Sequence, residues 1–212
     1  NFTSEYMAGR TPNPCVLCNT FIKWEALLKR ADMLDCELIA TGHYAKVREE
    51  DGRHVVSKGL DPGKDQSYVL WGLQQENLAR TRFPIGGFHK SRIREMAVES
   101  GFPELASKSE SYEICFIPDN DYRGFLKRKD PAAFEKLAHG KLVTTEGAVL
   151  GEHDGYPFFT IGQRKGLGIA TGEPLYVTDI RPESNTVVLG AKEQLNKQKM
   201  WVRRPNFVKL PA

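Results

Sequence analysis

The chain has 212 residues, of which 40% are hydrophobic and 27% charged, and its formal net charge is +3. This composition is that of a globular protein and excludes a fibrous or intrinsically disordered chain. The weak positive charge permits a nucleic-acid partner without requiring one. Basic residues gather between Lys192 and Lys209, where a phosphate-binding surface and an ordinary solvated surface explain them equally well.

Neither a membrane span nor a secretory signal is predicted. No apolar stretch reaches the about 20 residues of a spanning helix, and the first residues lack a basic region followed by an apolar one. We therefore expect a cytoplasmic protein with no membrane partner. In that compartment the four cysteines are expected to be thiols, metal ligands or catalysts rather than structural disulfides.

The first half of the chain alternates helical and extended patterns. Apolar residues at helical spacing predict a helix over 20–34, with Asn19 or Thr20 as its cap. The other predicted elements are a loop over 1–18, a buried strand over 37–41, a hairpin over 44–59, helices over 65–73 and 91–100, and a polar loop over 108–113.

The texture changes in the second half. Two short helices are predicted over 120–138, broken at Pro131, and short strands separated by glycine-containing turns follow Gly140. The strands are expected at 141–143, 148–150, 157–161, 175–180 and 186–189. This spacing is typical of a β-rich module or barrel, so we expect boundaries near 118–140 and near 172.

The motif Cys15-Val-Leu-Cys18 has three interpretations. A structural zinc site needs four ligands, usually as two close pairs, and only one such pair is present. A thioredoxin-like redox pair usually follows a strand, whereas this motif follows a proline-rich loop. A nucleophile at a helix N-terminus, where the helix dipole favours the thiolate, fits Cys18 best.

The other two cysteines are less informative. Cys36 lies in an apolar run and is predicted to be a buried core thiol. Cys115 is interpreted either as a core residue of a strand or as a thiol at the end of the polar loop, able to swing toward a second thiol.

Three further segments have the chemistry of recognition sites. Gly42-His43 follows a predicted strand, at the edge where α/β sheets bind ligands. Lys64-Asp65-Gln66 opens a predicted helix, a position suited to phosphate, although a simple capped start with Tyr68 in the core explains it as well. The stretch 160–169 places three glycines around Gln163, Arg164 and Lys165, as in an anion clamp or an exposed basic turn.

Together, five segments resemble the tRNA-specific 2-thiouridylases, the MnmA/TrmU family, in order and spacing. They are 9–19, 40–45, 64–68, 114–117 and 160–169. The resemblance covers the chain to residue 190. It implies an α/β fold in which a partial nucleotide-binding adenylation domain (1–118) precedes a small central domain (119–172) and a partial C-terminal β-barrel-like module (173–212).

The resemblance also implies an activity and its residues. Family members thiolate the wobble uridine at position 34 of tRNA, using ATP with Mg²⁺ and persulfide sulfur from a donor, either a sulfur-carrier protein or a cysteine desulfurase. By this resemblance Cys115 carries the persulfide and Cys18 is the partner nucleophile, and the two end as a disulfide. The remaining implied contacts are Asn13, Pro14 and Cys15 to the target base, Gly42 to ATP, and His43, Lys64, Asp65 and Gln66 to tRNA; no resident metal is implied.

Two departures from the family qualify this picture. The Ser-Gly-Gly-x-Asp-Ser loop that cradles ATP phosphates is absent, and the chain does not begin with Met. We therefore expect a fragment that is inactive alone. Some members also carry an aspartate where this chain has Cys15, so an acid–base role does not transfer to that position.

Two alternatives stay open. A non-catalytic zinc- or RNA-binding module would use the cysteines as ligands, and another ATP-pyrophosphatase relative would share the fold without the Cys18 and Cys115 spacing.

Overall fold

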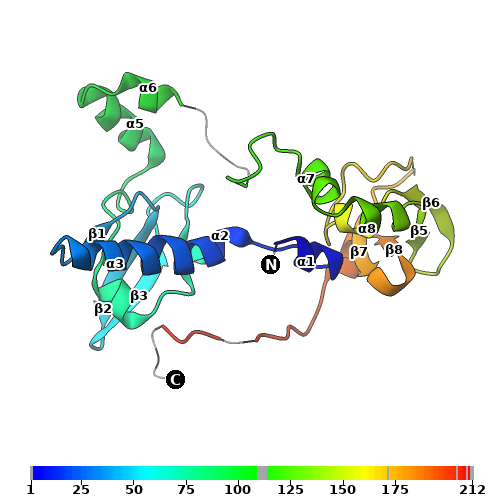
Figure 1. Cartoon of the computed structure of the whole chain (residues 1–212), viewed down its shortest axis with the longest axis horizontal. Helices are drawn as coiled ribbons and strands as arrows, with labels where there is room; N and C mark the ends of the chain where they lie inside the picture. The colour runs from blue at the N-terminus through cyan, green and yellow to red at the C-terminus, as the bar shows by residue number, and fades with distance from the viewer. Residues whose placement is uncertain (1, 109–113, 171, 204, 209, 211–212) are drawn as a thin grey trace. The chain divides into compact units, whose positions relative to one another are not determined.

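The structure, a computed structural model, describes residues 2–108, 114–170, 172–203, 205–208 and 210. The chain divides into two compact units (Figure 1). The helix–hairpin unit comprises Asn13–Tyr112 and Val202–Ala212, and the four-stranded unit comprises Asn1–Pro12 and Glu113–Trp201. Each unit therefore draws on two separate stretches of the sequence.

The helix–hairpin unit begins with one continuous helix, called here the cysteine helix. Its three parts are α2 (Pro14–Leu17), the wider π-type turn η1 (Cys18–Glu25) and α3 (Ala26–Met33). The helix thus starts six residues before the predicted position at 20. The reason is local: Pro14 has the fixed φ of a first helical residue, and the Asn13 side chain accepts a 3.2 Å hydrogen bond from the Cys15 backbone N–H.

The expected caps Asn19 and Thr20 are therefore wrong, because both lie inside the helix. The Thr20 hydroxyl donates back to the Val16 carbonyl at 3.0 Å, as mid-helix threonines do. Asn19 is buried and donates sideways to the Val69 carbonyl at 3.4 Å. These side chains hold the helix in place rather than starting it.

Two small sheets lie beside the cysteine helix. Strand β1 (Ile39–Ala40) pairs in parallel with β4 (Thr81–Arg82), and β2 (Ala45–Glu50) pairs antiparallel with β3 (Arg53–Lys58). The predicted hairpin is confirmed. The strand predicted over 37–41 forms only at Ile39–Ala40, and its predicted burial is wrong, because Ile39 is half-buried and Ala40 is exposed. Asp51 and Gly52 make the hairpin turn with positive φ values of 50° and 72°, the conformation of a two-residue hairpin loop.

The rest of this unit is helical. The segment predicted as a helix over 65–73 forms only the 3₁₀ turn η2 (Ser67–Leu70), whereas the helix predicted over 91–100 is confirmed as α5 (Lys90–Glu99). Helices α4 (Gln75–Ala79) and α6 (Pro103–Ser107) complete it. Its buried core consists of Trp24, Leu28, Ala45, Val69, Leu70, Leu73 and Leu78.

The end of the chain returns to this unit. Asn206 donates to the carbonyls of Trp71, at 2.6 Å, and Leu73, at 3.0 Å. The Val208 carbonyl accepts from Arg53 and from Gln75. Residues 206–208 are therefore bound to the unit by the side chain of Asn206 and by side chains of the hairpin and α4.

The four-stranded unit has a sheet in the order β6-β5-β8-β7. Its strands are β5 (Gly140–Thr144), β6 (Val149–His153), β7 (Tyr176–Arg181) and β8 (Thr186–Gly190). Strands β5 and β8 run parallel and the other pairs are antiparallel. Strands on both sides of residue 172 thus share one sheet; the predicted subdivision at that residue stays a prediction.

Helices and turns surround this sheet. The two predicted short helices are confirmed as α7 (Tyr122–Lys129) and α8 (Pro131–Lys136), while α1 (Phe2–Met7) replaces part of the predicted loop. The strand predicted over 157–161 is wrong, because Tyr156–Phe158 form the buried 3₁₀ turn η3. Short turns η4 (Pro182–Ser184) and η5 (Lys192–Leu195) complete the unit.

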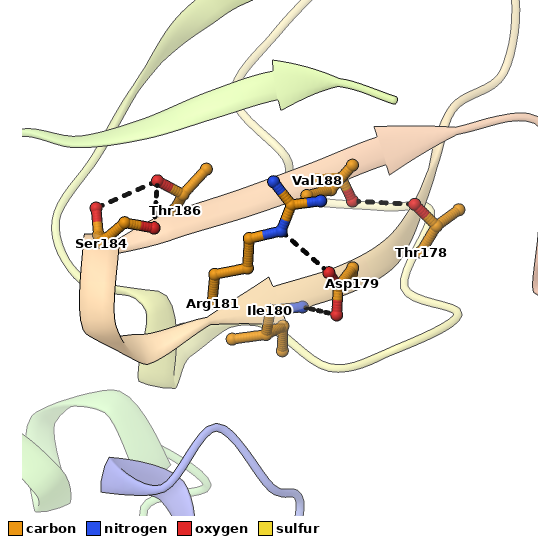
Figure 2. Close-up of polar contacts among 7 residues, drawn as sticks. All are labelled: Thr178, Asp179, Ile180, Arg181, Ser184, Thr186 and Val188. Carbon is orange, nitrogen blue, oxygen red and sulfur yellow. Dashed lines mark hydrogen bonds and ion pairs between the residues drawn. The ribbon is translucent and has the colours of Figure 1, made fainter. Parts of the chain in front are cut away.

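The β7–β8 hairpin contains a bulge at Thr178, between Val177 and Asp179 (Figure 2). The Thr178 hydroxyl donates to the Val188 carbonyl at 3.3 Å and so provides a polar contact within the bulge. On the same strand Asp179 accepts from Arg181 Nε at 3.0 Å. These local bonds stabilise a strand whose regular ladder is interrupted.

Candidate functional site

The cysteine helix presents two thiols on one turn. The Cys18 backbone N–H donates to the carbonyls of Pro14 and Cys15, so the two cysteines are three helical residues apart. Cys15 is exposed and Cys18 half-buried, and neither forms a disulfide. Because the helix starts at Pro14, Cys15 occupies the first turn and Cys18 the second. The expectation that Cys18 sits directly at the helix N-terminus is therefore wrong.

Two contacts of the residues that follow Cys18 hold this turn of the helix in place. Asn19 donates to the Val69 carbonyl of η2 as described above, and Thr20 packs against Gly72. A Cβ on Gly72 would lie 2.4 Å from Thr20 Oγ1, so only a glycine allows this close packing. Further along, Trp24 is fully buried and its indole N–H donates to Thr81 Oγ1 at 2.7 Å. The helix is therefore pinned to η2 and to strand β4.

His43 follows strand β1 and is buried, with 7% of its surface exposed. Its Nδ1 lies 2.8 Å from Thr41 Oγ1, and its Nε2 lies 3.5 Å from the Lys23 ammonium. Burial, and then the charge of Lys23, lowers the pKa of His43 to about 4. The ring is therefore neutral near pH 7, with Nε2 accepting from Lys23. Lys23 itself is exposed.

Gly42, before His43, is exposed, and a Cβ there would approach nothing closer than 3.9 Å. The parallel strands β1 and β4 end together here, and their following residues His43 and Phe83 pack with ring centroids 5.9 Å apart. This is the carboxyl edge of a parallel pair, where α/β folds bind ligands.

The Lys64-Asp65-Gln66 segment is tied to the hairpin. Asp65 accepts from the Gly59 N–H at 2.9 Å and from the Ser67 hydroxyl at 2.8 Å. Burial opposes ionisation of Asp65, but these hydrogen bonds outweigh it and lower its pKa. The Gln66 amide accepts from the Tyr44 N–H at 3.0 Å. Asp65 and Gln66 thus shape the segment, while Tyr68, expected in the core, is 63% exposed.

Cys115 lies in an exposed turn of the four-stranded unit, not in a buried strand. Its neighbour Phe116 packs on Phe2 and Phe125 with ring centroids 5.2 and 5.8 Å apart. Ile117 is buried and its N–H donates to the Ile114 carbonyl at 2.9 Å. The turn is therefore anchored on its C-terminal side. Of the polar loop predicted over 108–113, residues 109–113 lie outside the described residues.

Cys36 is exposed, so its prediction as a core thiol is wrong. The helix ends just before it, and Asp35 adopts a positive φ of 52° that turns the chain outward. Arg80 then holds the segment by donating to the carbonyls of Cys36 and Glu37, each at 2.9 Å.

The glycine-rich stretch 160–169 forms a turn with exposed cations. The Gln163 amide accepts from the Thr160 N–H at 3.1 Å and donates to the Lys165 carbonyl at 2.9 Å. Gln163 is thus structural, whereas Arg164 and Lys165 are exposed. The geometry fits the basic turn expected from the sequence.

Two findings concern metals and membranes. Among the residues that the structure describes, no three histidine, cysteine or carboxylate side chains gather in an arrangement suited to a metal ion. No helix within the same residues is long and apolar enough to cross a bilayer.

Comparison with known families identifies the class of protein. Residues 1–119 match the family model described as tRNA methyl transferase HUP domain, and residues 125–191 match that of the tRNA methyl transferase PRC-barrel domain. The chain belongs to this family. The predicted order, an α/β domain of the adenylating type followed by a barrel-type domain, is confirmed.

Individual relatives show which members of this family the chain resembles. Proteins named tRNA-specific 2-thiouridylase MnmA from Cytophaga hutchinsonii, Amoebophilus asiaticus and Salinibacter ruber are 62%, 61% and 60% identical to this chain. The alignments cover 95%, 100% and 99% of the chain but 55%, 56% and 55% of these relatives. The chain thus spans about half the length of the relatives it matches, and the resemblance seen in its motifs is confirmed.

Sequence patterns missed several residues that shape this site. The contact between Lys23 and His43 joins residues 20 positions apart, and neither helical nor strand periodicity signals it. Trp24 was recognisable as part of an apolar stripe, but its hydrogen bond to Thr81 was not.

Proposed function

We propose that this chain is the sulfur-handling part of an enzyme that uses ATP to thiolate C2 of the wobble uridine in tRNA. The observation that carries the proposal is the half-buried thiol residue Cys18 on the capped turn 13–18, in a chain 62% identical to a named 2-thiouridylase. A second thiol residue, the exposed Cys115, lies on an anchored turn. Sulfur transfer by this route needs two such thiols.

The chemistry requires an activated oxygen and two sulfur centres. The uridine 2-oxygen attacks the α-phosphorus of ATP, a substrate, and pyrophosphate leaves, so that AMP becomes the leaving group at C2. The terminal sulfur of a Cys115 persulfide attacks C2, and AMP departs. The Cys18 thiolate then attacks Cys115 Sγ. The sulfur bound to C2 leaves with the electron pair of the broken S–S bond, and a Cys18–Cys115 disulfide forms.

The remaining implied residues have supporting roles in this proposal. Asn13 and Pro14 fix the turn that meets the flipped-out base, and Gly42 leaves room at the ATP edge. His43 is buried, so in this proposal it does not contact tRNA itself. It positions the exposed ammonium of Lys23, which binds the tRNA. Lys64 is the cation of its segment, while Asp65 and Gln66 hold that segment in shape.

Among the described residues, no three histidine, cysteine or carboxylate side chains are arranged to hold Mg²⁺. The persulfide is supplied by a donor protein, either a sulfur carrier or a cysteine desulfurase. Because the proposed substrate is tRNA, we propose that the enzyme acts in the cytoplasm.

The test uses the intact gene in a strain that lacks it. Nucleosides from total tRNA are measured by mass spectrometry after complementation with wild type, Cys18→Ser, Cys115→Ser or Cys36→Ser. We expect 2-thiouridine with wild type and Cys36→Ser and its loss with the other two. Restoration by Cys18→Ser or Cys115→Ser contradicts the proposal, as does a methylated uridine in place of the thiolated one. Stoichiometric zinc lost on Cys18→Ser would favour the binding-module alternative.

A further inference from the structure

The first turn of the cysteine helix carries a thiol that the proposed sulfur transfer does not use. Cys15 stands three residues before Cys18, and the Cys18 N–H donates to its carbonyl. Helical geometry separates Cα atoms three residues apart by about 5 Å. A disulfide needs Cα atoms roughly 4.4–6.8 Å apart, so this pair has the backbone spacing to close with a small side-chain adjustment.

The two thiols also differ in the way that an exchange reaction requires. Cys15 is exposed and lies in the first turn of the helix, where the positive end of the helix dipole stabilises a thiolate. Cys18 is half-buried one turn later. Cys15 is therefore placed as the attacking thiol and Cys18 as the sulfur that is attacked.

We infer that Cys15 resolves the Cys18–Cys115 disulfide at the end of each catalytic cycle; this inference rests on the proposed function. The Cys15 thiolate attacks Cys18 Sγ, the bond between Cys18 and Cys115 breaks, and Cys115 leaves as a thiolate. One disulfide is exchanged for another, so this step requires no oxidant or reductant. Cys115 is then free to receive the next sulfur, and an external dithiol reduces the Cys15–Cys18 disulfide.

The location of this disulfide has a chemical consequence. Cys15 and Cys18 belong to the helix–hairpin unit and Cys115 to the four-stranded unit. Exchange therefore converts a bond that joins two units into a bond within one helical turn, whose Cys15 sulfur is exposed to a reductant.

Cys36 provides a matched control. It is also exposed and belongs to the same unit, but it follows the far end of α3. The helix rises about 22 Å between Cys18 and Met33, so Cys36 cannot reach Cys18 while the helix is folded.

The test maps disulfides in the protein expressed from its intact gene. Samples of wild type, Cys15→Ser and Cys36→Ser are equilibrated with diamide, alkylated, digested with trypsin and analysed by mass spectrometry. Cys15 and Cys18 share the tryptic peptide 11–23, Cys115 lies in 109–123 and Cys36 in 31–46. An internal disulfide and a crosslink between peptides are thus distinguished directly.

We expect the internal disulfide of peptide 11–23 in severalfold excess over the 11–23 to 109–123 crosslink in wild type and in Cys36→Ser. In Cys15→Ser we expect the crosslink to accumulate. The inference is overturned if wild type shows as much crosslink as Cys15→Ser, or if peptide 11–23 stays reduced. Retained 2-thiouridine in Cys18→Ser and Cys115→Ser cells would instead overturn the proposed function, whatever the peptides show.

Discussion

The indole Nε1 of Trp24 donates a 2.7 Å hydrogen bond to Oγ1 of Thr81, and both side chains are completely buried. The same Thr81 hydroxyl donates onward to the Asn77 carbonyl at 2.6 Å. The Thr81 hydroxyl of strand β4 therefore binds the cysteine helix and at the same time donates to the carbonyl of Asn77 in α4. This bond fixes the helix on which Cys15 and Cys18 lie.

Thr81→Val is expected to destabilise the protein by about 1–3 kcal/mol, because it leaves a buried indole N–H without an acceptor while keeping the side-chain volume. Urea-induced unfolding measures the change in the free energy of unfolding. Thr81→Ser keeps the hydroxyl and is the control, although it also removes a buried methyl group. Equal losses in Thr81→Val and Thr81→Ser would show that the hydrogen bond contributes little.

Gly72→Ala is expected to cost about 1–3 kcal/mol by overpacking, since the new methyl group would meet the Thr20 hydroxyl at 2.4 Å. Gly87→Ala is the matched control, because a Cβ at Gly87 has no atom within 4 Å. The double variant Thr20→Ala/Gly72→Ala removes the clashing oxygen and should recover part of the loss. Additive effects of the two substitutions in thermal unfolding would rule out this contact as the cause.

The free energy of unfolding should decrease as the pH is lowered, because of His43. Its pKa is about 4 in the folded protein and 6.5 ordinarily, so below pH 6.5 the unfolded chain binds a proton that the folded protein does not. His43 therefore destabilises the fold progressively from about pH 6.5 to pH 4, by up to about 3 kcal/mol, with no further change below that range. Unfolding free energies measured across this range should depend less on pH in His43→Gln. An unchanged pH dependence would refute the assignment.

Lys23→Gln tests the second cause of that shift. Removing the neighbouring positive charge should raise the pKa of His43, but burial, the larger cause, should still keep it below 6.5. Histidine resonances followed by NMR during a pH titration give the value directly. Lys29→Gln, which removes an exposed lysine paired with Glu25 on the same helix, is the control and should leave His43 unchanged.

Local patterns predicted much of the fold because short-range chemistry determines those elements. The hairpin turns at Asp51-Gly52, and helix α7 ends just before Pro131, which is the first residue of α8, as their turn and breaker residues predict. The apolar run at 157–161 was wrongly predicted to be a strand. A proline and buried aromatic rings pack as well in a 3₁₀ turn as in a strand, and here they form the turn η3.

The site was less predictable for two physical reasons. The expected cap Asn19 lies inside the cysteine helix, because Asn13 caps the helix six residues earlier and is followed by a proline with a preset φ. Burial depends on contacts distant in sequence. Cys36 was predicted to be buried because it lies in an apolar run, but it is exposed and follows Asp35, whose φ is positive. The roles of Cys18 and Cys115 came from resemblance, since no local pattern links thiols in different units.

The return of residues 206–208 to the hairpin and α4 has a consequence for biosynthesis. The chain passes from one unit to the other after residues 12, 112 and 201. During translation, the stretch 13–112 leaves the ribosome before the segment that supplies Asn206 and Val208, and α1 must wait for the barrel-type sheet that buries Tyr6. Nascent chains arrested before residue 202 should therefore be more protease-sensitive in 13–112 than chains that extend beyond residue 208. Synthesis of residues 202–208 thus adds contacts that stabilise the unit that carries Cys18.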